Sequence, residues 1–405
     1  MASERVYVVH GNGGTQGELF LLIFVPVIGM LLRNLAVPYL SYGIRWSKRK
    51  DFYLKMLVDF VCVVVPMIAT QTILVEWARG IAVVMLIFCA IIFFFMVSEQ
   101  SMFTRDNITL RQTMNRMIEE HHSPTTFLTY LRSLVFLLVA VAILAVDFGI
   151  FPRRFAKTEK YGHSLMDIGV AAFIIANALI GPLKTGHRLD QGERLRASRR
   201  FPAVYSSTVI LVALGAGRTL ILALLGYPYE VSEYGVHWNF FYTLAAVTLA
   251  TYVLPTTRTL VTATILAVGH QIALGRGLEE WIMDDAAPRD GLFEANREGI
   301  CSLAGYLAIF YYARALGRFI RKTVLSALRL RSWAECSLHL AVISLFALSV
   351  QWGAEWALGP PSRRLVNLPY ILSMVSMASF ILAATMAVQV VQFTIWAARL
   401  PNFGS

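Results

Sequence analysis

Long apolar stretches recur along this chain, and they constrain its fold more than any other feature. A stretch of about 18 to 25 residues with few charges is long enough to cross a bilayer as a helix. We count about eleven, which predicts an all-α, polytopic bundle of transmembrane helices. The predicted spans are residues 18–37, 55–75, 80–97, 127–146, 164–183, 203–225, 237–255, 258–275, 299–319, 337–357 and 368–394.

The chain contains no polar region long enough to form a second domain. The longest polar connections, residues 98–126 and 276–298, are too short to bury a core of their own. We therefore treat residues 1–405 as a single integral-membrane domain without a soluble domain. Charged residues make up only 15 % of the chain, against roughly 25 % in soluble domains.

The cysteines and histidines do not form a metal-binding pattern. Cys62, Cys89, Cys301 and Cys336 all lie in or beside predicted spans, which disfavours a disulfide framework and a paired zinc motif. We therefore predict no metal site. The net charge of +11 does not indicate nucleic-acid binding either, because the basic residues alternate with the spans and form no single patch.

The basic residues predict the orientation of the chain in the membrane. Basic clusters fall in every second connection, at residues 45–55, 105–116, 184–200 and 314–331, and cytoplasmic connections are the ones enriched in Lys and Arg. This places the N-terminus in the lumen and the C-terminus in the cytoplasm. The glycosylation pattern at Asn107 would then be cytoplasmic, so we expect it to stay unmodified.

The unusual polar sequences collect on the opposite, lumenal side. Solvated connectors need only be charged, whereas varied polar sequence gathered on one face is typical of a shared site. The polar blocks are GNGG at 11–14, DFGIFPRRFAK at 147–157 with its continuation to 167, YEVSEYGVHWN at 229–239, EANREG at 294–299 and SRRLVNLPY at 362–370.

The run from Asp147 to Lys157 is the strongest site candidate, because charges at the end of a span are costly unless they are paired or used. Asp147 and Lys157 can also be explained as an interfacial ion pair, or Asp147 as the cap of a turn. Arg153 and Arg154 suit a lipid phosphate, since guanidinium groups bind phosphate oxygens bidentately. Anchoring to headgroups is the plainer explanation.

Other polar residues have similar alternatives. Arg363 and Arg364 can hold a phosphate or anchor the chain, and His237 can act as a base or as a structural hydrogen-bonding residue. A further group of polar residues suits hydrogen bonds to sugar hydroxyls, although helix capping accounts equally well for an Asn before a span. This group is Asn239, Asn296, Arg297 and Glu298.

Four blocks, in order, resemble one enzyme family: VDFGIFPRRFAKTEKYGHSLMDIGV (146–170), EYGVHWNFF (233–241), ANREGICSLAGYLAIF (295–310) and SRRLVNLPY (362–370). They are similar to the glucosaminyl-phosphatidylinositol inositol acyltransferases, the PIG-W family of GPI-anchor biosynthesis. Members of that family usually continue past the last block through two further spans. We find no such segment here, which is expected of a shortened member, of an incomplete gene model or of a member whose last helices are dispensable.

The resemblance implies a multi-span endoplasmic reticulum enzyme that moves a fatty acyl group, usually palmitoyl, from acyl-coenzyme A to the inositol 2-hydroxyl of glucosaminyl-phosphatidylinositol. The partners would be these two substrates and the bilayer, without nucleic acid. Acyl-coenzyme A would be a co-substrate, and no cofactor is expected.

The resemblance also implies a catalytic pair, which falls on Asp147 and Lys157. Asp147 would accept the inositol proton as general base, and Lys157 would orient that carboxylate or bind the developing oxyanion. A lipid transporter, a scramblase or a noncatalytic subunit of GPI assembly is the alternative. Transporters tend to show inverted repeats and charges at the bilayer midplane, and we find no convincing repeat.

Overall fold

The computed structural model describes residues 11, 13–40, 48–103, 126–184, 193–226, 231–254, 257–325 and 330–399. All regular structure in these ranges is helical, apart from two isolated β-bridges, which confirms the predicted all-α class. The long helices are α1 (Gln16–Leu40), α2 (Lys48–Asp59), α4 (Ala78–Phe103), α6 (Thr126–Ala145), α7 (Ile168–Lys184), α8 (Glu193–Leu225), α10 (Phe240–Val253), α11 (Thr259–Ala273), α15 (Leu303–Ile320), α16 (Leu330–Leu358) and α17 (Leu368–Arg399). Shorter helices are α3 (Val65–Gln71), α9 (Val231–Tyr234), α12 (Glu279–Met283), α13 (Leu292–Ala295) and α14 (Arg297–Cys301).

Helical structure coincides with every predicted span. Within the described ranges, 8 helical stretches are long and apolar enough to cross a membrane. The predicted spans at 164–183, 237–255 and 258–275 correspond to α7, α10 and α11, which have 17, 14 and 15 residues. The protein is thus a multi-pass membrane protein, and the count of eleven spans stays a prediction.

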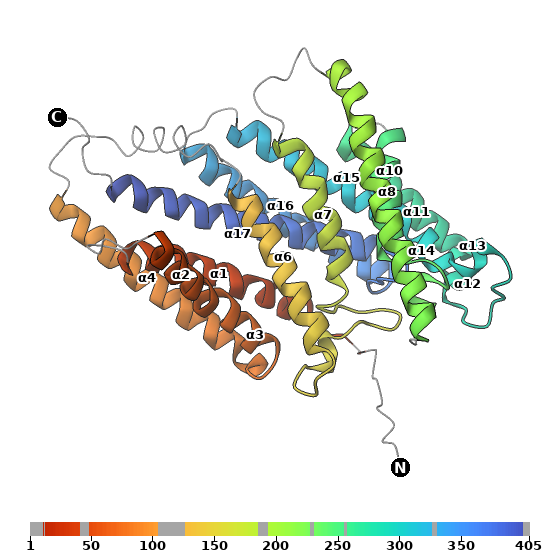
Figure 1. Ribbon diagram of the computed structural model, residues 1–405, viewed down its shortest axis with the longest axis horizontal. Helices are drawn as coiled ribbons and strands as arrows, with labels where there is room; N and C mark the ends of the chain where they lie inside the picture. The colour runs from red at the N-terminus through yellow and green to blue at the C-terminus, as the bar shows by residue number, and fades with distance from the viewer. Residues whose placement is uncertain are drawn as a thin grey trace.

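Helix α17 forms the centre of the bundle (Figure 1). It packs against α1, α6, α7, α11, α15 and α16, and 78 % of its apolar window is buried, more than in any other described span. Figure 1 shows α1 to α4 gathered toward one end of the bundle and α8, α10 and α11 toward the other. An apolar helix buried on most sides is what a central element requires.

Several charges and hydroxyls inside the bundle are paired across helices. The Arg33 guanidinium of α1 contacts the Asp59 carboxylate of α2 at 2.6 Å. Ser344 of α16 donates to the Ser376 carbonyl of α17 at 2.8 Å, and Ser376 donates back to the Ser344 carbonyl at 2.9 Å. Small hydroxyl residues allow close helix approach in membranes and bond across it, so these contacts help to hold α16 against α17.

Candidate functional site

The connection between α6 and α7, residues 146–167, is anchored in the core by two phenylalanines. Phe151 and Phe155 are buried, with ring centroids 6.0 Å apart in an edge-to-face arrangement. Pro152 is extended, and a single 3₁₀ turn follows over Arg153–Phe155. The aromatic rings thus hold the connection in place, while Arg153 stays exposed at its surface.

The glycine-rich N-terminal block packs against this connection. Gly11 donates its N–H to the Lys157 carbonyl at 2.9 Å, and Gly14 donates to the His163 carbonyl at 2.7 Å. A Cβ at Gly11 would lie 1.9 Å from the Arg153 carbonyl oxygen, so only glycine allows this approach. The block is therefore a structural strap over residues 153–163.

Lys157 belongs to a closed ring of polar contacts. Its ammonium group contacts the Glu233 carboxylate of α9. Glu233 lies 3.8 Å from the Arg363 guanidinium, which contacts Asp167 at 2.9 Å. Asp167 accepts a hydrogen bond from the hydroxyl of Thr158 at 2.6 Å, and Thr158 follows Lys157 in the chain. Two cations and two carboxylates therefore alternate around a ring that joins three polar blocks.

Burial and neighbouring charges together shift the pKa values of Asp167 and Arg363 in this ring. Burial raises the pKa of Asp167, while attraction to Arg363 and the hydrogen bonds from Thr158 oppose that rise. Burial also disfavours the charged form of Arg363, but Glu233 and Asp167 outweigh it and raise the pKa of the guanidinium. Arg363 therefore keeps its charge although only 5 % of the residue is exposed.

Asp147 lies apart from this ring. It is exposed at the end of α6, and within the described part of the chain no ion pair joins it to Lys157. Arg153 donates to the Val146 carbonyl at 2.9 Å, beside Asp147. The structure thus brings Asp147 close to Arg153, and the interfacial ion pair between Asp147 and Lys157 is not formed.

Arg154 is bound by two carboxylates. It donates two hydrogen bonds to Glu18 of α1, at 3.0 and 2.9 Å, and one to Glu76 at 2.8 Å. Hydrogen bonds to these carboxylates raise the pKa of Arg154. These contacts join the connection to α1 and to the turn before α4. The sequence suggested phosphate binding or headgroup anchoring for Arg154, and this structural role is neither.

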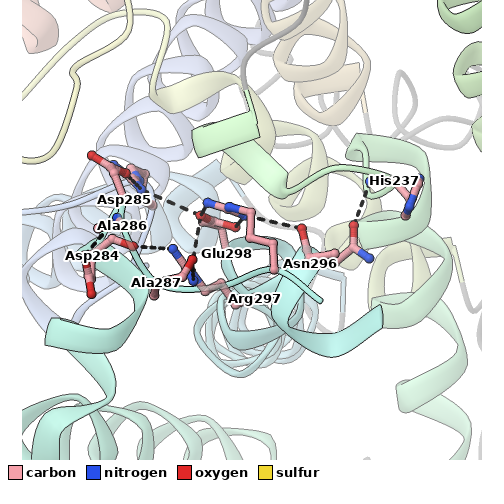
Figure 2. A network of polar contacts seen from close by, with 11 residues as sticks. His237, Asp284, Asp285, Ala286, Ala287, Asn296, Arg297 and Glu298 are labelled. Atoms are coloured by element: carbon pink, nitrogen blue, oxygen red, sulfur yellow. Dashed lines mark hydrogen bonds and ion pairs between the residues drawn. The ribbon is translucent and has the colours of Figure 1, made fainter. Parts of the chain in front are cut away.

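Arg364 belongs to a second cluster, around the fully buried carboxylate of Glu298. Figure 2 shows Glu298 in this cluster. Arg289 contacts Glu298 at 2.6 Å, and Arg364 lies 3.7 Å from the same oxygen. Arg364 also lies 3.4 Å from the exposed carboxylate of Asp285. Adjacent arginines, Arg363 and Arg364, therefore bind different carboxylates, and both are too buried to anchor headgroups.

Arg297 and Asn296 have structural contacts in the same region (Figure 2). Arg297 is fully buried, donates to the carbonyls of Asp284 and Ala287, and lies 5.5 Å from the Trp281 ring centroid. The side-chain oxygen of Asn296, Oδ1, accepts hydrogen bonds from the backbone N–H groups of His237 and Trp238, at 2.8 and 2.9 Å. Both side chains hold the connections together.

Asn239 caps α10, as one of the alternatives predicted. Its side-chain oxygen accepts from the backbone of Phe241 and Tyr242. Its amide donates to the Gly215 carbonyl at 3.0 Å and to the Thr219 hydroxyl at 3.2 Å, both on α8. The side chain of His237 is exposed nearby and stays a candidate base.

A chain of side chains extends from the strap into the bundle. His163 lies 3.1 Å from Glu355, which accepts from Gln351 at 2.6 Å, and Gln351 accepts from Gln16 at 2.5 Å. Burial lowers the pKa of His163, and the attraction of Glu355 partly opposes this effect. This chain links α1 and α16 to the polar connections.

An apolar cavity lies directly beneath the polar connections, between α1, α6, α7 and α17. Its lining includes Ile168, which follows Asp167 in the chain, and continues to Leu131 of α6. Along α6 the lining runs from Leu131 to Val139, about 12 Å at the helical rise. One end of the cavity therefore lies beside the ring that contains Lys157.

Sequence reasoning missed three carboxylates that organise the site. Glu233 lies in the EYGVHWN block, and Glu18 begins the first predicted span, so the sequence shows both as acids on the face where the polar blocks gather. Glu76 lies in the short turn before α4. Their partners come from distant parts of the chain, and nothing in the local sequence identifies them.

Comparisons of the sequence with known proteins identify its family. The GWT1 family model matches residues 2–401. The human protein named glucosaminyl-phosphatidylinositol-acyltransferase PIGW is 33 % identical over 94 % of this chain and 76 % of its own length. The Dictyostelium discoideum phosphatidylinositol-glycan biosynthesis class W protein is 28 % identical over 92 % of this chain and 80 % of its own length. The Aspergillus fumigatus GPI-anchored wall transfer protein 1 is 37 % identical over 61 % of this chain and 52 % of its own length. The chain belongs to the GWT1 family.

Proposed function

We propose that this protein transfers a fatty acyl group from acyl-coenzyme A to the inositol 2-hydroxyl of glucosaminyl-phosphatidylinositol. The observation that carries the proposal is the position of the apolar cavity, which begins at Ile168, next to Asp167 of the polar ring. An acyl chain needs an apolar cavity, and the reacting groups need a polar surface at its mouth. The name of the human relative supplies the substrate class.

Lys157 is suited to bind the oxyanion. An ammonium group has three donors, and the contact with Glu233 uses one of them. The remaining donors can stabilise the tetrahedral intermediate, where the loss of one donor typically costs about 2.7–4 kcal/mol. Lys157 is 31 % exposed at its side chain, so a substrate can reach it.

Asp147 is suited to accept the proton. Its carboxylate is exposed and free of a cationic partner among the described residues. It takes the proton of the inositol 2-hydroxyl while that oxygen attacks the thioester carbonyl. The new C–O bond forms, the C–S bond breaks, and the coenzyme A thiolate leaves and takes up a proton. Arg153, beside Asp147, can bind the substrate phosphate.

The proposal also covers the orientation of the protein in its membrane, the acyl group and the cofactor. The distribution of Lys and Arg supports a lumenal position for the polar face in the endoplasmic reticulum membrane, with the N-terminus lumenal and the C-terminus cytoplasmic. The acyl group is palmitoyl, and no cofactor takes part.

The proposal is tested with purified protein in lipid nanodiscs. Protein, palmitoyl-coenzyme A and glucosaminyl-phosphatidylinositol are incubated together, and the lipid is analysed by mass spectrometry. We expect a lipid heavier by one palmitoyl group and stoichiometric release of coenzyme A. Redistribution of the lipid across a vesicle bilayer without a new ester bond would instead identify a carrier.

A further inference from the structure

Helix α8 carries an unusual charge on a lipid-facing surface. Only 6 % of its apolar window, Ser207–Leu225, is buried, and Figure 1 shows the helix at the edge of the bundle, beside α10. Arg218 is exposed within this window, seven residues before Leu225, or about 10 Å along the helix. An arginine at this depth is costly in hydrocarbon and marks a functional site unless it is paired.

Arg218 differs from Arg33, another arginine within a described span. Arg33 is neutralised by Asp59 at 2.6 Å. Within the described residues, no carboxylate forms an ion pair with Arg218 and no hydrogen bond engages it. The exposed apolar surface of α8 is suited to contact lipid, so a group from the membrane, such as a lipid phosphate, can neutralise Arg218.

Arg218 also lies next to the candidate site. Asn239 binds α8 at Gly215 and Thr219, and Arg218 directly precedes Thr219. On the other side, the Arg218 charge acts on Tyr234: burial raises the pKa of that phenol and Arg218 opposes the rise. Tyr234 follows Glu233, the partner of Lys157. The lipid-facing guanidinium is thus placed at the side of the polar ring.

Three of the four arginines that the sequence suggested for phosphate binding contact carboxylates, and the fourth, Arg153, stays exposed in the connection after α6. Arg154 is held by Glu18 and Glu76. Arg363 and Arg364 are buried against carboxylates of the two clusters. A phosphate arriving from the bilayer would meet exposed arginines first, and Arg218 is one that faces the lipid.

We propose that Arg218 binds the phosphodiester of the inositol lipid as it approaches the polar ring from the bilayer along α8. The inference rests on the proposed function, because it assumes an inositol phospholipid as substrate. Guanidinium groups bind phosphate oxygens bidentately, and an otherwise unpaired group in lipid gains most from this contact. Arg218 is then a residue for lipid recognition, separate from the groups that react.

The test compares Arg218→Gln and Arg218→Lys with wild type in nanodiscs. Arg79→Gln is the matched control, because Arg79 is also exposed at the site-facing end of a lipid-facing helix, α4. We expect Arg218→Gln to raise KM for glucosaminyl-phosphatidylinositol by about ten- to hundredfold, the effect of one charge-assisted hydrogen bond. KM for acyl-coenzyme A and the melting temperature should not change. Arg218→Lys should show a smaller increase, and Arg79→Gln none.

In the activity assay, two outcomes would overturn the inference. One is an unchanged KM for the lipid in Arg218→Gln. The other is a raised KM for acyl-coenzyme A instead, because coenzyme A phosphates would then be the ligand. If wild type transfers no acyl group, the proposed function fails, and direct binding still tests Arg218. In that binding assay, wild type should bind phosphatidylinositol more tightly than diacylglycerol, and Arg218→Gln should lose this preference. An equal preference in both proteins would also overturn the inference.

Discussion

The Lys157 ammonium is bound to the carboxylate of Glu233, 76 residues further along the chain. Lys157 lies in the connection after α6, and Glu233 lies in the four-residue helix α9. The position of the candidate catalytic amine therefore depends on a residue outside its own polar block. The two residues of the candidate catalytic pair therefore differ in their surroundings. Lys157 belongs to the ring of polar contacts, whereas Asp147 is exposed and lies outside that ring.

Replacing Asp147 by Asn should abolish acyl transfer and leave the protein folded. Loss of a general base lowers the rate by about 10²–10⁴, whereas exposed substitutions usually change stability by less than about 0.5 kcal/mol. Turnover and melting temperature in detergent measure the two effects. Glu159→Gln, an exposed acid of the same connection, is the control and should stay active. Near-normal turnover in Asp147→Asn would remove Asp147 from the mechanism.

Replacing Glu233 by Gln should lower both activity and stability. Lys157 and Arg363 would each lose a carboxylate neighbour, and an unsatisfied buried group costs about 1–3 kcal/mol. The comparison with Glu233→Asp separates charge from shape, because the shorter acid keeps the charge and should recover part of the activity. Equal turnover in wild type and Glu233→Gln would show that Lys157 does not need this partner.

Filling the apolar cavity should change the preferred acyl chain. Ala172 lines the cavity, and a phenylalanine there would occupy space that a long chain needs. We expect Ala172→Phe to lower the rate with palmitoyl-coenzyme A more than with octanoyl-coenzyme A. Ala140→Phe, on an exposed position of α6, is the control. The same fractional loss for both donors would argue against an acyl chain in this cavity.

His163 should make the protein less stable in acid. Its pKa is lowered from the ordinary 6.5, mainly because it is buried, so the unfolded chain binds a proton that the folded protein does not. Its contribution to stability is complete above about pH 6.5 and is lost as pH falls through the lower folded value. Melting temperatures between pH 5 and 7.5 should fall on acidification, and His163→Gln should flatten the slope. A rise in stability on acidification would mean that Glu355 dominates.

The orientation has a test that does not depend on activity. Asn107 lies outside the described residues, in a connection that the basic clusters place in the cytoplasm, so it should carry no glycan. Treatment with an endoglycosidase should leave the mobility of the protein unchanged. A shift in mobility that Asn107→Gln removes would place the polar connections on the cytoplasmic side.

The helical class and the gathering of polar blocks could be predicted from the sequence. Transmembrane length is set by the bilayer, so an apolar run such as 127–146 defines α6 almost completely. The sequence places the GNGG block on the same face as residues 147–167, and the hydrogen bonds of Gly11 and Gly14 agree with this placement. The packing of the block over residues 153–163 is seen only in the structure.

The partners of individual charges could not be predicted, because they depend on how distant connections pack. The sequence suggested Arg154 as a phosphate ligand, but in the structure its guanidinium group contacts Glu18 and Glu76. Asn239 suited sugar binding equally well, and only the position of α8 shows that it joins two helices. Roles in binding and catalysis stay predictions for every residue of the site.

The neighbouring arginines at 363 and 364 have one more consequence. Arg363 contacts the ring that contains Lys157, and Arg364 contacts the cluster around Glu298. Both lie in a tight turn that ends at Val366, whose φ is 49° and whose carbonyl lies against Gly305 of α15. A one-residue insertion or deletion there would shift the register, so that neither guanidinium group met its own carboxylate. We therefore expect evolution to tolerate changes of length in the surrounding connections but not in this turn.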